Sequence, residues 1–188
     1  LNQNDDIHMV SCNQIFYLEE SQKTKNHYLS YRFKDERTVV NPTHMQRFVQ
    51  STASSVFLKT ELLTKHNLSF KNEIKPVFED GFFINELLIL EPNINIAFLQ
   101  KPIYYYTKRE DSSSTVDTAW KKPSRYDDAL KFALLELLKT DNILYIQRYS
   151  LYQVFWYFKK IVNHSQTIDF LTNEQIQNFK KLLHEIFS

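Results

Sequence analysis

The stretch FEDGFFINELLILE, residues 78–91, carries the strongest structural pattern in the chain. Over residues 79–91, apolar side chains fall on most of the circumference of a helix, which predicts a helix that is buried on nearly all sides. Pro92 follows it and is expected to end it, because the residue before a proline is pushed out of the helical region. We therefore expect a buried helix at 79–91.

Glu79 and Asp80 open this predicted helix. The positive end of the helix dipole favours an ionised carboxylate there, whereas the neighbouring phenylalanines oppose ionisation by desolvation. A carboxylate in this position could act as a general base that accepts a proton from a bound hydroxyl. Acidic residues are also common in first turns because of the dipole alone. Both interpretations stay open at this point.

Gly81 is the only glycine among the 188 residues. Average usage near 7% would supply about a dozen in a chain of this length. Glycine early in a helix costs about 0.5–1 kcal/mol relative to alanine, so its position needs a reason. We expect a ligand or another part of the backbone to pass close beside the carboxylates. A tight turn with positive φ is the alternative.

Length and composition indicate one substantial globular domain, or one domain with an appendage. Hydrophobic residues make up 43% of the chain and aromatic residues 15%, which favours a packed core over disorder. A net charge of +1 gives no support for a nucleic-acid-binding protein. Cys12 is the only cysteine, so no internal disulfide can form and a reducing compartment is expected.

Strand and helix patterns alternate through residues 1–118. Strands are expected at 7–20, 27–33, 54–59, 93–100 and 103–108, with a surface loop at 32–42 and a short helix after Pro42. A helix is expected at 60–66, with Thr60 as its N-cap and Asn67 as its stop.

The remaining residues, 119–188, are expected to form a helical extension. A polar loop at 109–118 leads into helices predicted at 123–140, 143–162 and 173–187, the first as a single amphipathic helix. Polar and charged residues interrupt 143–162, so it is not expected to span a membrane. Its segment 151–158 is expected to form core or an interface, and a membrane-surface role is the alternative.

A second candidate site follows the aromatic strand at 103–108. Lys108 and Arg109 could hold diphosphate oxygens, the arginine through two parallel hydrogen bonds. Ser112, Ser113 and Ser114 could donate further hydrogen bonds, and a solvated loop is the alternative. The six histidines show no metal-ligand spacing, and one glycine cannot build a glycine-rich phosphate loop.

The order of these segments resembles a known family. The runs TASSVFLKTELLTKHNLSF (52–70), FEDGFFINELLI (78–89) and PIYYYTKREDSSST (102–115) resemble the second half of a family 2 glycosyltransferase domain with the GT-A fold. The continuation VDTAWKKPSRYDDALKFALLELL (116–138) is similar to bacterial enzymes that build capsules or teichoic-acid-type polymers. The resemblance covers residues 5–140.

The resemblance implies an α/β fold, namely the acceptor-side half of a GT-A-like domain followed by the helical extension. It implies an inverting transfer from a nucleotide-diphospho-sugar to a hydroxyl of a cell-surface polysaccharide or teichoic-acid-type acceptor. Asp80 would be the catalytic base, Glu79 would orient Asp80 or the acceptor, and Lys108 and Arg109 would neutralise the departing diphosphate. The implied location is cytoplasmic, with a peripheral contact at the inner face of the membrane.

One departure from the family's pattern concerns the cofactor. The family binds its nucleotide and a divalent metal, Mn²⁺ or Mg²⁺, through an Asp-x-Asp motif in its N-terminal half. No Asp-x-Asp occurs in this chain, and the pair Asp5-Asp6 has no strand before it. We expect the nucleotide half to precede Leu1, the metal ligands to lie mostly outside this chain, and the chain alone to be inactive.

Two other classes of protein stay open. One is a non-catalytic interaction module whose helical tail docks a partner. The other is a helical-plus-sheet domain of a phosphotransferase in which Lys108 and Arg109 act alone. Convergence of residues 78–83 and 104–115 on one cleft would favour the glycosyltransferase.

Overall fold

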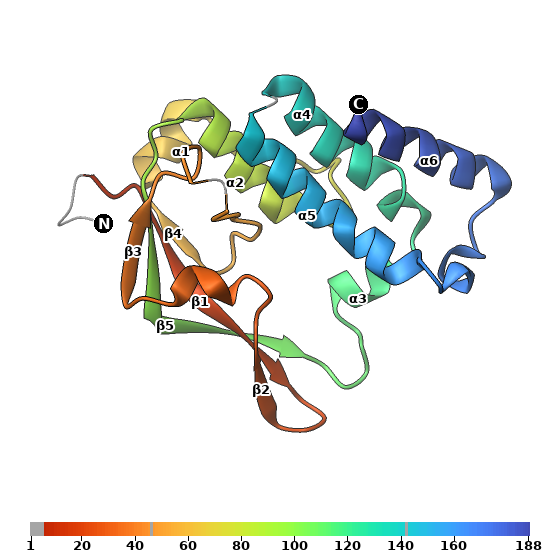
Figure 1. Ribbon diagram of the computed structural model, residues 1–188, viewed down its shortest axis with the longest axis horizontal. Helices are drawn as coiled ribbons and strands as arrows, with labels where there is room; N and C mark the ends of the chain where they lie inside the picture. The colour runs from red at the N-terminus through yellow and green to blue at the C-terminus, as the bar shows by residue number, and fades with distance from the viewer. Residues whose placement is uncertain (1–5, 46, 142) are drawn as a thin grey trace.

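The computed structural model describes residues 6–45, 47–141 and 143–188. Asp5 of the Asp5-Asp6 pair lies outside these residues. A mixed, curled sheet occupies one end of the molecule, and helices α4, α5 and α6 lie at the other end (Figure 1). The α/β class predicted from the sequence is confirmed, and its assignment to a GT-A half stays a prediction.

The sheet is built around two long parallel strands, β1 (Met9–Leu18) and β5 (Ile96–Lys108). Three short antiparallel strands complete it: β2 (Lys23–Asn26), β3 (Arg37–Val40) and β4 (Val56–Leu58). The strand order is β2-β1-β5-β3, and β4 also pairs with β1. β1 follows the predicted strand at 7–20 and β4 the one at 54–59.

Strand β5 is continuous where the sequence predicts two strands separated by Lys101-Pro102. Cys12 of β1 pairs with Leu99, whereas the next residue, Asn13, pairs with Ile103. The three residues in between form a bulge that contains Pro102, which has no N–H to donate to the ladder. The proline is therefore accommodated within the strand without ending it.

The region between β2 and β4 differs most from the sequence expectations. The predicted strand at 27–33 instead ends in a short 3-10 helix, η1 (Ser30–Phe33), which turns Arg32 and Phe33 into the core. The predicted loop at 32–42 contains β3, because Val39 and Val40 pair with β5. After Pro42, the described residues form turns where a short helix is predicted.

Helices α1 (Thr60–His66) and α2 (Glu79–Leu90) lie where the sequence predicts them. Lys59, and not Thr60, is the N-cap of α1, and no side chain caps it. Asn67 ends α1 in the left-handed region with φ of 48°, and its N–H reaches the carbonyls of the last turn.

The chain from 109 to 140 is more broken than predicted. The polar loop contains a short helix, α3 (Thr115–Ala119). The single helix predicted at 123–140 is wrong, because a 3-10 turn η2 (Pro123–Arg125), a π-helix η3 (Leu130–Leu135) and α4 (Glu136–Thr140) follow one another. Helices α5 (Leu144–Ile161) and α6 (Asn173–Phe187) match their predictions, with a 3-10 turn η4 (Ser165–Ile168) between them.

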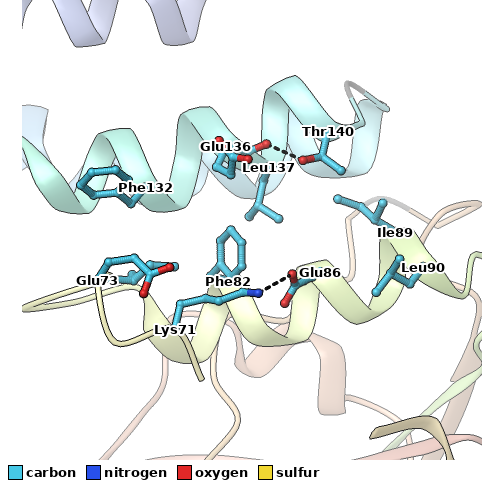
Figure 2. Close-up of a pocket in the computed structure, with 11 residues that line it drawn as sticks. Lys71, Glu73, Phe82, Glu86, Ile89, Leu90, Phe132, Glu136, Leu137 and Thr140 are labelled. Carbon is cyan, nitrogen blue, oxygen red and sulfur yellow. Dashed lines mark hydrogen bonds and ion pairs between the residues drawn. The ribbon is translucent and has the colours of Figure 1, made fainter. Parts of the chain in front are cut away.

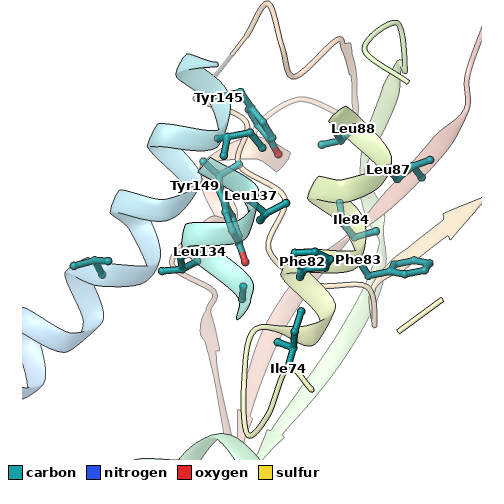
Figure 3. Packing of buried hydrophobic residues seen from close by; sticks show 14 of the residues in the cluster. Ile74, Phe82, Phe83, Ile84, Leu87, Leu88, Leu134, Leu137, Tyr145 and Tyr149 are labelled. Atoms are coloured by element: carbon teal, nitrogen blue, oxygen red, sulfur yellow. The ribbon is translucent and has the colours of Figure 1, made fainter. Parts of the chain in front are cut away.

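Helix α2 lies at the centre of the core, as its apolar circumference predicts. Figure 3 shows Phe82 and Leu88 of α2 facing Leu137 of α4 and Tyr145 and Tyr149 of α5. Met9, Ile96 and Phe98 of the sheet belong to the same cluster, so the core includes residues from both 1–118 and 119–188. The boundary at 118/119 stays a prediction. In the described parts of the chain, every helix is too short or too polar to cross a membrane.

Candidate active site

Asp80 lies in the first turn of α2 and is fixed through one of its two carboxylate oxygens. Oδ2 accepts hydrogen bonds from the Thr52 hydroxyl and from the backbone N–H of Ala53, both at 3.2 Å. Among the described residues, Oδ1 has no hydrogen-bond donor. One oxygen thus positions the side chain, and the other makes no hydrogen bond to the described part of the chain.

The loop that holds Asp80 is anchored by Gln50, whose side chain is fully buried. Its Oε1 accepts hydrogen bonds from Ser11 of β1 at 3.1 Å and from Arg32 at 2.5 Å. Its Nε2 donates to the carbonyl of Thr52 at 2.7 Å. The sheet therefore controls the position of the loop that contacts the carboxylate.

Helices α2 and α5 also hold this loop in place, through hydrogen bonds to the backbone of Gln50. Asn85 donates to the Gln50 carbonyl at 3.2 Å and to the Gly81 carbonyl at 2.7 Å. The Tyr145 hydroxyl accepts from the Gln50 N–H at 3.0 Å, and burial raises the pKa of this hydroxyl to about 12. Sequence reasoning missed Gln50, Asn85 and Tyr145, because nothing local in the sequence marks a polar residue as buried.

Arg32 is a buried cation without a carboxylate partner among the described residues. It donates to the carbonyls of Leu29 at 3.1 Å and Val49 at 2.7 Å, and it lies 5.1 Å from the ring centres of Phe33 and Phe98. Burial lowers the pKa of the guanidinium to about 10. It stays charged at neutral pH. Its hydrogen bonds to the carbonyl oxygens of Leu29 and Val49 hold the chain just before the loop that contacts Asp80.

Glu79 differs from Asp80 in its surroundings. Its Oε2 is buried and has no hydrogen-bond partner in the described chain. Desolvation raises the pKa of this carboxyl, the neighbouring Asp80 adds to the rise, and a backbone hydrogen bond and Lys75 oppose it. The adjacent carboxyl groups thus occupy different environments, and Glu79 binds its proton more tightly than a solvated glutamate.

The space beside Gly81 is filled by Tyr149 of α5. A Cβ built on Gly81 would overlap the Tyr149 hydroxyl, and the ring carbon Cζ would lie 2.8 Å from it. Gly81 has no positive φ, so the tight-turn alternative is wrong. The close neighbour found here is a buried side chain, where the sequence analysis expected a ligand or backbone, and a contact between Gly81 and an acceptor stays a prediction.

Phe78, directly before the carboxylates, has a positive φ. It is the N-cap of α2 with φ of 81°, a conformation that costs a non-glycine residue about 1–3 kcal/mol. Phe78 packs with Val77 against Ala119 and Ala129. Contacts from the region of α3 and η3 therefore hold the start of α2 in this conformation.

Lys108 and Arg109 lie where β5 ends, as predicted. Lys108 Nζ is 3.2 Å from Asp117 Oδ1 and 5.3 Å from the ring centre of Tyr106. Arg109 donates to the Ser113 hydroxyl at 3.3 Å. The pairing of Lys108 with Asp117 was not foreseen, because Asp117 reads as part of a polar loop until α3 is known to form.

The serines shape the loop that follows. Ser112 has φ of 52°, and the Ser113 N–H donates to Asp111 at 2.9 Å. Ser114 caps α3, since its hydroxyl accepts from the Asp117 N–H at 3.2 Å. The side chains of Ser112 and Ser113 are exposed and accessible to a ligand.

The two candidate sites are connected through the packing of Phe78 against the cluster that contains Ala119. Phe78 precedes Glu79 and packs against Ala119, the last residue of α3, which begins a few residues after Ser113. No hydrogen bond or ion pair is recorded, within the described residues, between Glu79 or Asp80 and Lys108 or Arg109. Their convergence on one cleft stays a prediction.

No family model matches the chain. Over 146 residues it is 30% identical to the minor teichoic acid biosynthesis protein GgaA of Bacillus subtilis (strain 168). This chain is similar to a protein of teichoic acid biosynthesis. The matched stretch is 74% of this chain but 31% of the relative, so the chain spans about a third of that protein's length. The expected likeness to teichoic-acid-type proteins is confirmed, whereas family 2 and GT-A stay predictions.

Arg125 is a second buried cation, close to the start of α2. Its guanidinium lies 3.6 Å from the ring centre of Trp120 and 5.8 Å from that of Phe78. Nε and Nη1 have no hydrogen-bond partner in the described chain, and burial lowers the pKa of the side chain. The contacts of the Arg125 guanidinium with these two rings thus hold the segment after α3 close to Phe78.

A cavity of about 400 Å³ lies between α2 and the helix η3–α4 (Figure 2). Phe82, Ile89, Phe132 and Leu137 form much of its wall, and the ion pair of Lys71 with Glu86, 3.2 Å apart, lies beside them. Neither Asp80 nor Lys108 lines this cavity. The candidate site is therefore defined by the carboxylates and their hydrogen bonds, on a different part of α2.

Proposed function

We propose that this chain is the acceptor-side part of an inverting glycosyltransferase of family 2 with a GT-A-like domain. It transfers a sugar from a nucleotide-diphospho-sugar to a hydroxyl of a cell-surface polysaccharide or teichoic-acid-type acceptor. The likeness to a teichoic acid biosynthesis protein supports this class. The observation that carries the proposal is the Asp80 carboxylate, held by Thr52 and Ala53 through Oδ2 alone.

Asp80 acts as the general base through Oδ1. This oxygen takes the proton of the acceptor hydroxyl while the hydroxyl oxygen bonds to the anomeric carbon of the donor. The bond between that carbon and the diphosphate oxygen breaks, and the nucleotide diphosphate leaves with the electron pair. Attack opposite the leaving group inverts the configuration at the anomeric carbon.

Glu79 lies beside the base in a more desolvated environment. Desolvation raises the pKa of its carboxyl, so it binds a proton more tightly than a solvated glutamate does. We assign it the orientation of Asp80 or of the acceptor hydroxyl.

Lys108 and Arg109 neutralise the departing diphosphate, with Ser112 and Ser113 as hydrogen-bond donors. Asp117 pairs with Lys108, and Ser113 accepts a hydrogen bond from Arg109. These contacts are with partly or fully exposed side chains, and such pairs contribute about 0–1 kcal/mol, so a diphosphate can displace them.

The divalent metal that the family uses has no ligand set in this part of the chain. Within residues 6–45, 47–141 and 143–188, no three His, Cys, Asp or Glu side chains gather in a way that could hold a metal ion. No step above therefore passes through a metal, and the proposed roles concern only the base, its neighbour and the anion-binding residues.

The test is Asp80→Asn in the full-length protein, assayed for sugar transfer. We expect kcat to fall about 10²–10⁴-fold, because asparagine keeps the shape of the side chain but cannot accept the proton. Glu86→Gln, on the same helix and outside the proposed machinery, is the matched control and should keep its turnover. Near-normal turnover of Asp80→Asn with a lowered melting temperature would show that the carboxylate only stabilises the helix.

A further inference from the structure

Helix α5 exposes a row of large apolar side chains. Leu144 is 47% exposed, Leu151 53%, Phe155 55%, Phe158 40% and Val162, directly after the helix, 57%. Side chains of this kind are usually buried, and single exposed ones need no explanation. Five along one side of a helix are more than isolated exposures, and they indicate a contact with another body.

These five residues fall on one side of the helix. Leu151 lies seven residues after Leu144, and the later members follow at spacings of four, three and four residues, so at 3.6 residues per turn all five fall within a strip about 60° wide. The strip runs the length of the 18-residue helix, about 27 Å. The other side of α5 packs into the core through Tyr145, Tyr149 and Tyr157. On the strip itself, the ring of Phe158 stacks on Phe187 of α6 with ring centres 6.1 Å apart, and both rings stay partly exposed. Packing within the chain therefore explains one apolar side of α5 and leaves most of this strip exposed.

The charges around the strip are all positive on α5 itself. Arg148 lies beside the strip, Lys159 and Lys160 lie near its C-terminal end, and the helix contains no acidic residue. Lys159 Nζ lies 5.0 Å from the ring centre of Trp156 and 5.4 Å from that of Tyr28. Trp, Tyr and Lys side chains combine an apolar body with a polar tip, which suits the boundary between water and lipid.

An open groove of about 310 Å³ continues the surface beyond the helix. Leu151 and Phe155 of the strip line it together with Leu29 and Val49, and Arg47 adds a further cation opposite Arg148. The apolar area and the basic charge therefore extend together from α5 toward the segments around η1.

We propose that the strip Leu144, Leu151, Phe155, Phe158 and Val162 is a membrane-surface contact, which lays α5 along an anionic lipid bilayer. Apolar side chains enter the boundary of the acyl chains, while Arg148, Lys159 and Lys160 meet lipid phosphates. A second copy of the chain fits less well, because pairing two such strips would oppose like charges with no acidic residue on α5 to compensate them.

This inference does not depend on the glycosyltransferase proposal. The strip contains none of the residues assigned to the base, its neighbour or the diphosphate. A variant that loses vesicle binding but keeps sugar transfer, or one that loses sugar transfer but keeps vesicle binding, would show that the two proposals are independent.

The experiment is co-sedimentation of the 188-residue chain with phosphatidylglycerol–phosphatidylcholine vesicles and with phosphatidylcholine vesicles alone. We expect binding to the anionic vesicles, weaker binding to the neutral ones, and release by high salt. The double variant Leu151→Glu/Phe155→Glu should lose about tenfold or more of this binding. Both positions are exposed, so its circular dichroism spectrum should match that of the unmodified chain.

Phe57→Glu is the matched control, since Phe57 on β4 is 65% exposed and lies outside the strip. It should bind vesicles like the unmodified chain. The proposal is overturned if anionic vesicles do not bind the chain, or if the double variant binds them normally. A dimer in sedimentation equilibrium that the double variant abolishes, without any vesicle binding, would assign the strip to a second copy instead.

Discussion

The Tyr149 hydroxyl of α5 occupies the space that a Cβ on Gly81 of α2 would need. This contact brings the helical extension directly against the first turn of α2, next to Glu79 and Asp80. Tyr149 is fully buried, and burial raises the pKa of its hydroxyl well above the usual range. The only glycine of the chain thus makes room for a neutral, buried tyrosine.

Gly81→Ala should destabilise the protein by about 1–3 kcal/mol, because the added methyl group overlaps Tyr149 in a packed core. Without that contact, alanine in a helix would stabilise by about 1 kcal/mol. Urea unfolding of the Gly81→Ala protein and of the unmodified protein measures this difference in unfolding free energy. Tyr149→Phe in the same chain should restore part of the loss, since the hydroxyl is the closest atom. A Gly81→Ala protein at least as stable as the unmodified one would contradict this packing.

The contribution of Glu79 to the free energy of unfolding should become less favourable as the pH rises. Its pKa in the folded chain lies above the ordinary value of 4.5, so the protonated form is favoured by folding. The stabilisation is fully present below pH 4.5 and is lost as the pH rises through the folded pKa. Unfolding free energies of Glu79→Gln and the unmodified chain, measured across this range, should therefore diverge as the pH rises, with glutamine the more stable. Parallel curves would show that Glu79 is solvated.

Arg32→Met should destabilise the chain and loosen the loop that holds Asp80. The Leu29 and Val49 carbonyls would lose their buried donor, at about 1–3 kcal/mol for each group left unsatisfied. Arg37→Met is the control, because Arg37 is exposed on β3. Hydrogen exchange at Ala53 should accelerate only in Arg32→Met. Equal stability of the two variants would mean that the buried hydrogen bonds contribute nothing.

Arg109→Ala in the full-length protein should raise the donor KM about tenfold or more, corresponding to about 1.4 kcal/mol of lost binding. Lys101→Ala is the control, since Lys101 lies on the same strand and pairs with Glu36 at the surface. Steady-state kinetics with varied donor would measure both. Unchanged donor KM and kcat in Arg109→Ala would mean that residues 109–113 are only a solvated loop.

The elements that depend on local pattern could be predicted from the amino-acid sequence. Helices α1, α2, α5 and α6 follow from apolar periodicity, and Pro92 and Asn67 mark where two of them end. The sequence also located Glu79 and Asp80 in a first turn, because that position depends only on where α2 begins.

Contacts between residues far apart in the chain could not be predicted in this way and are seen only in the folded protein. The contact between Gly81 and Tyr149, the anchoring of Asp80's loop by Gln50 and Arg32, and the burial of Arg125 all join segments far apart in the chain. Strand β5 crosses Pro102 because β1 pairs with it on both sides of the bulge. Local propensity contains no information about such partners, since their free energy arises only when the segments pack together.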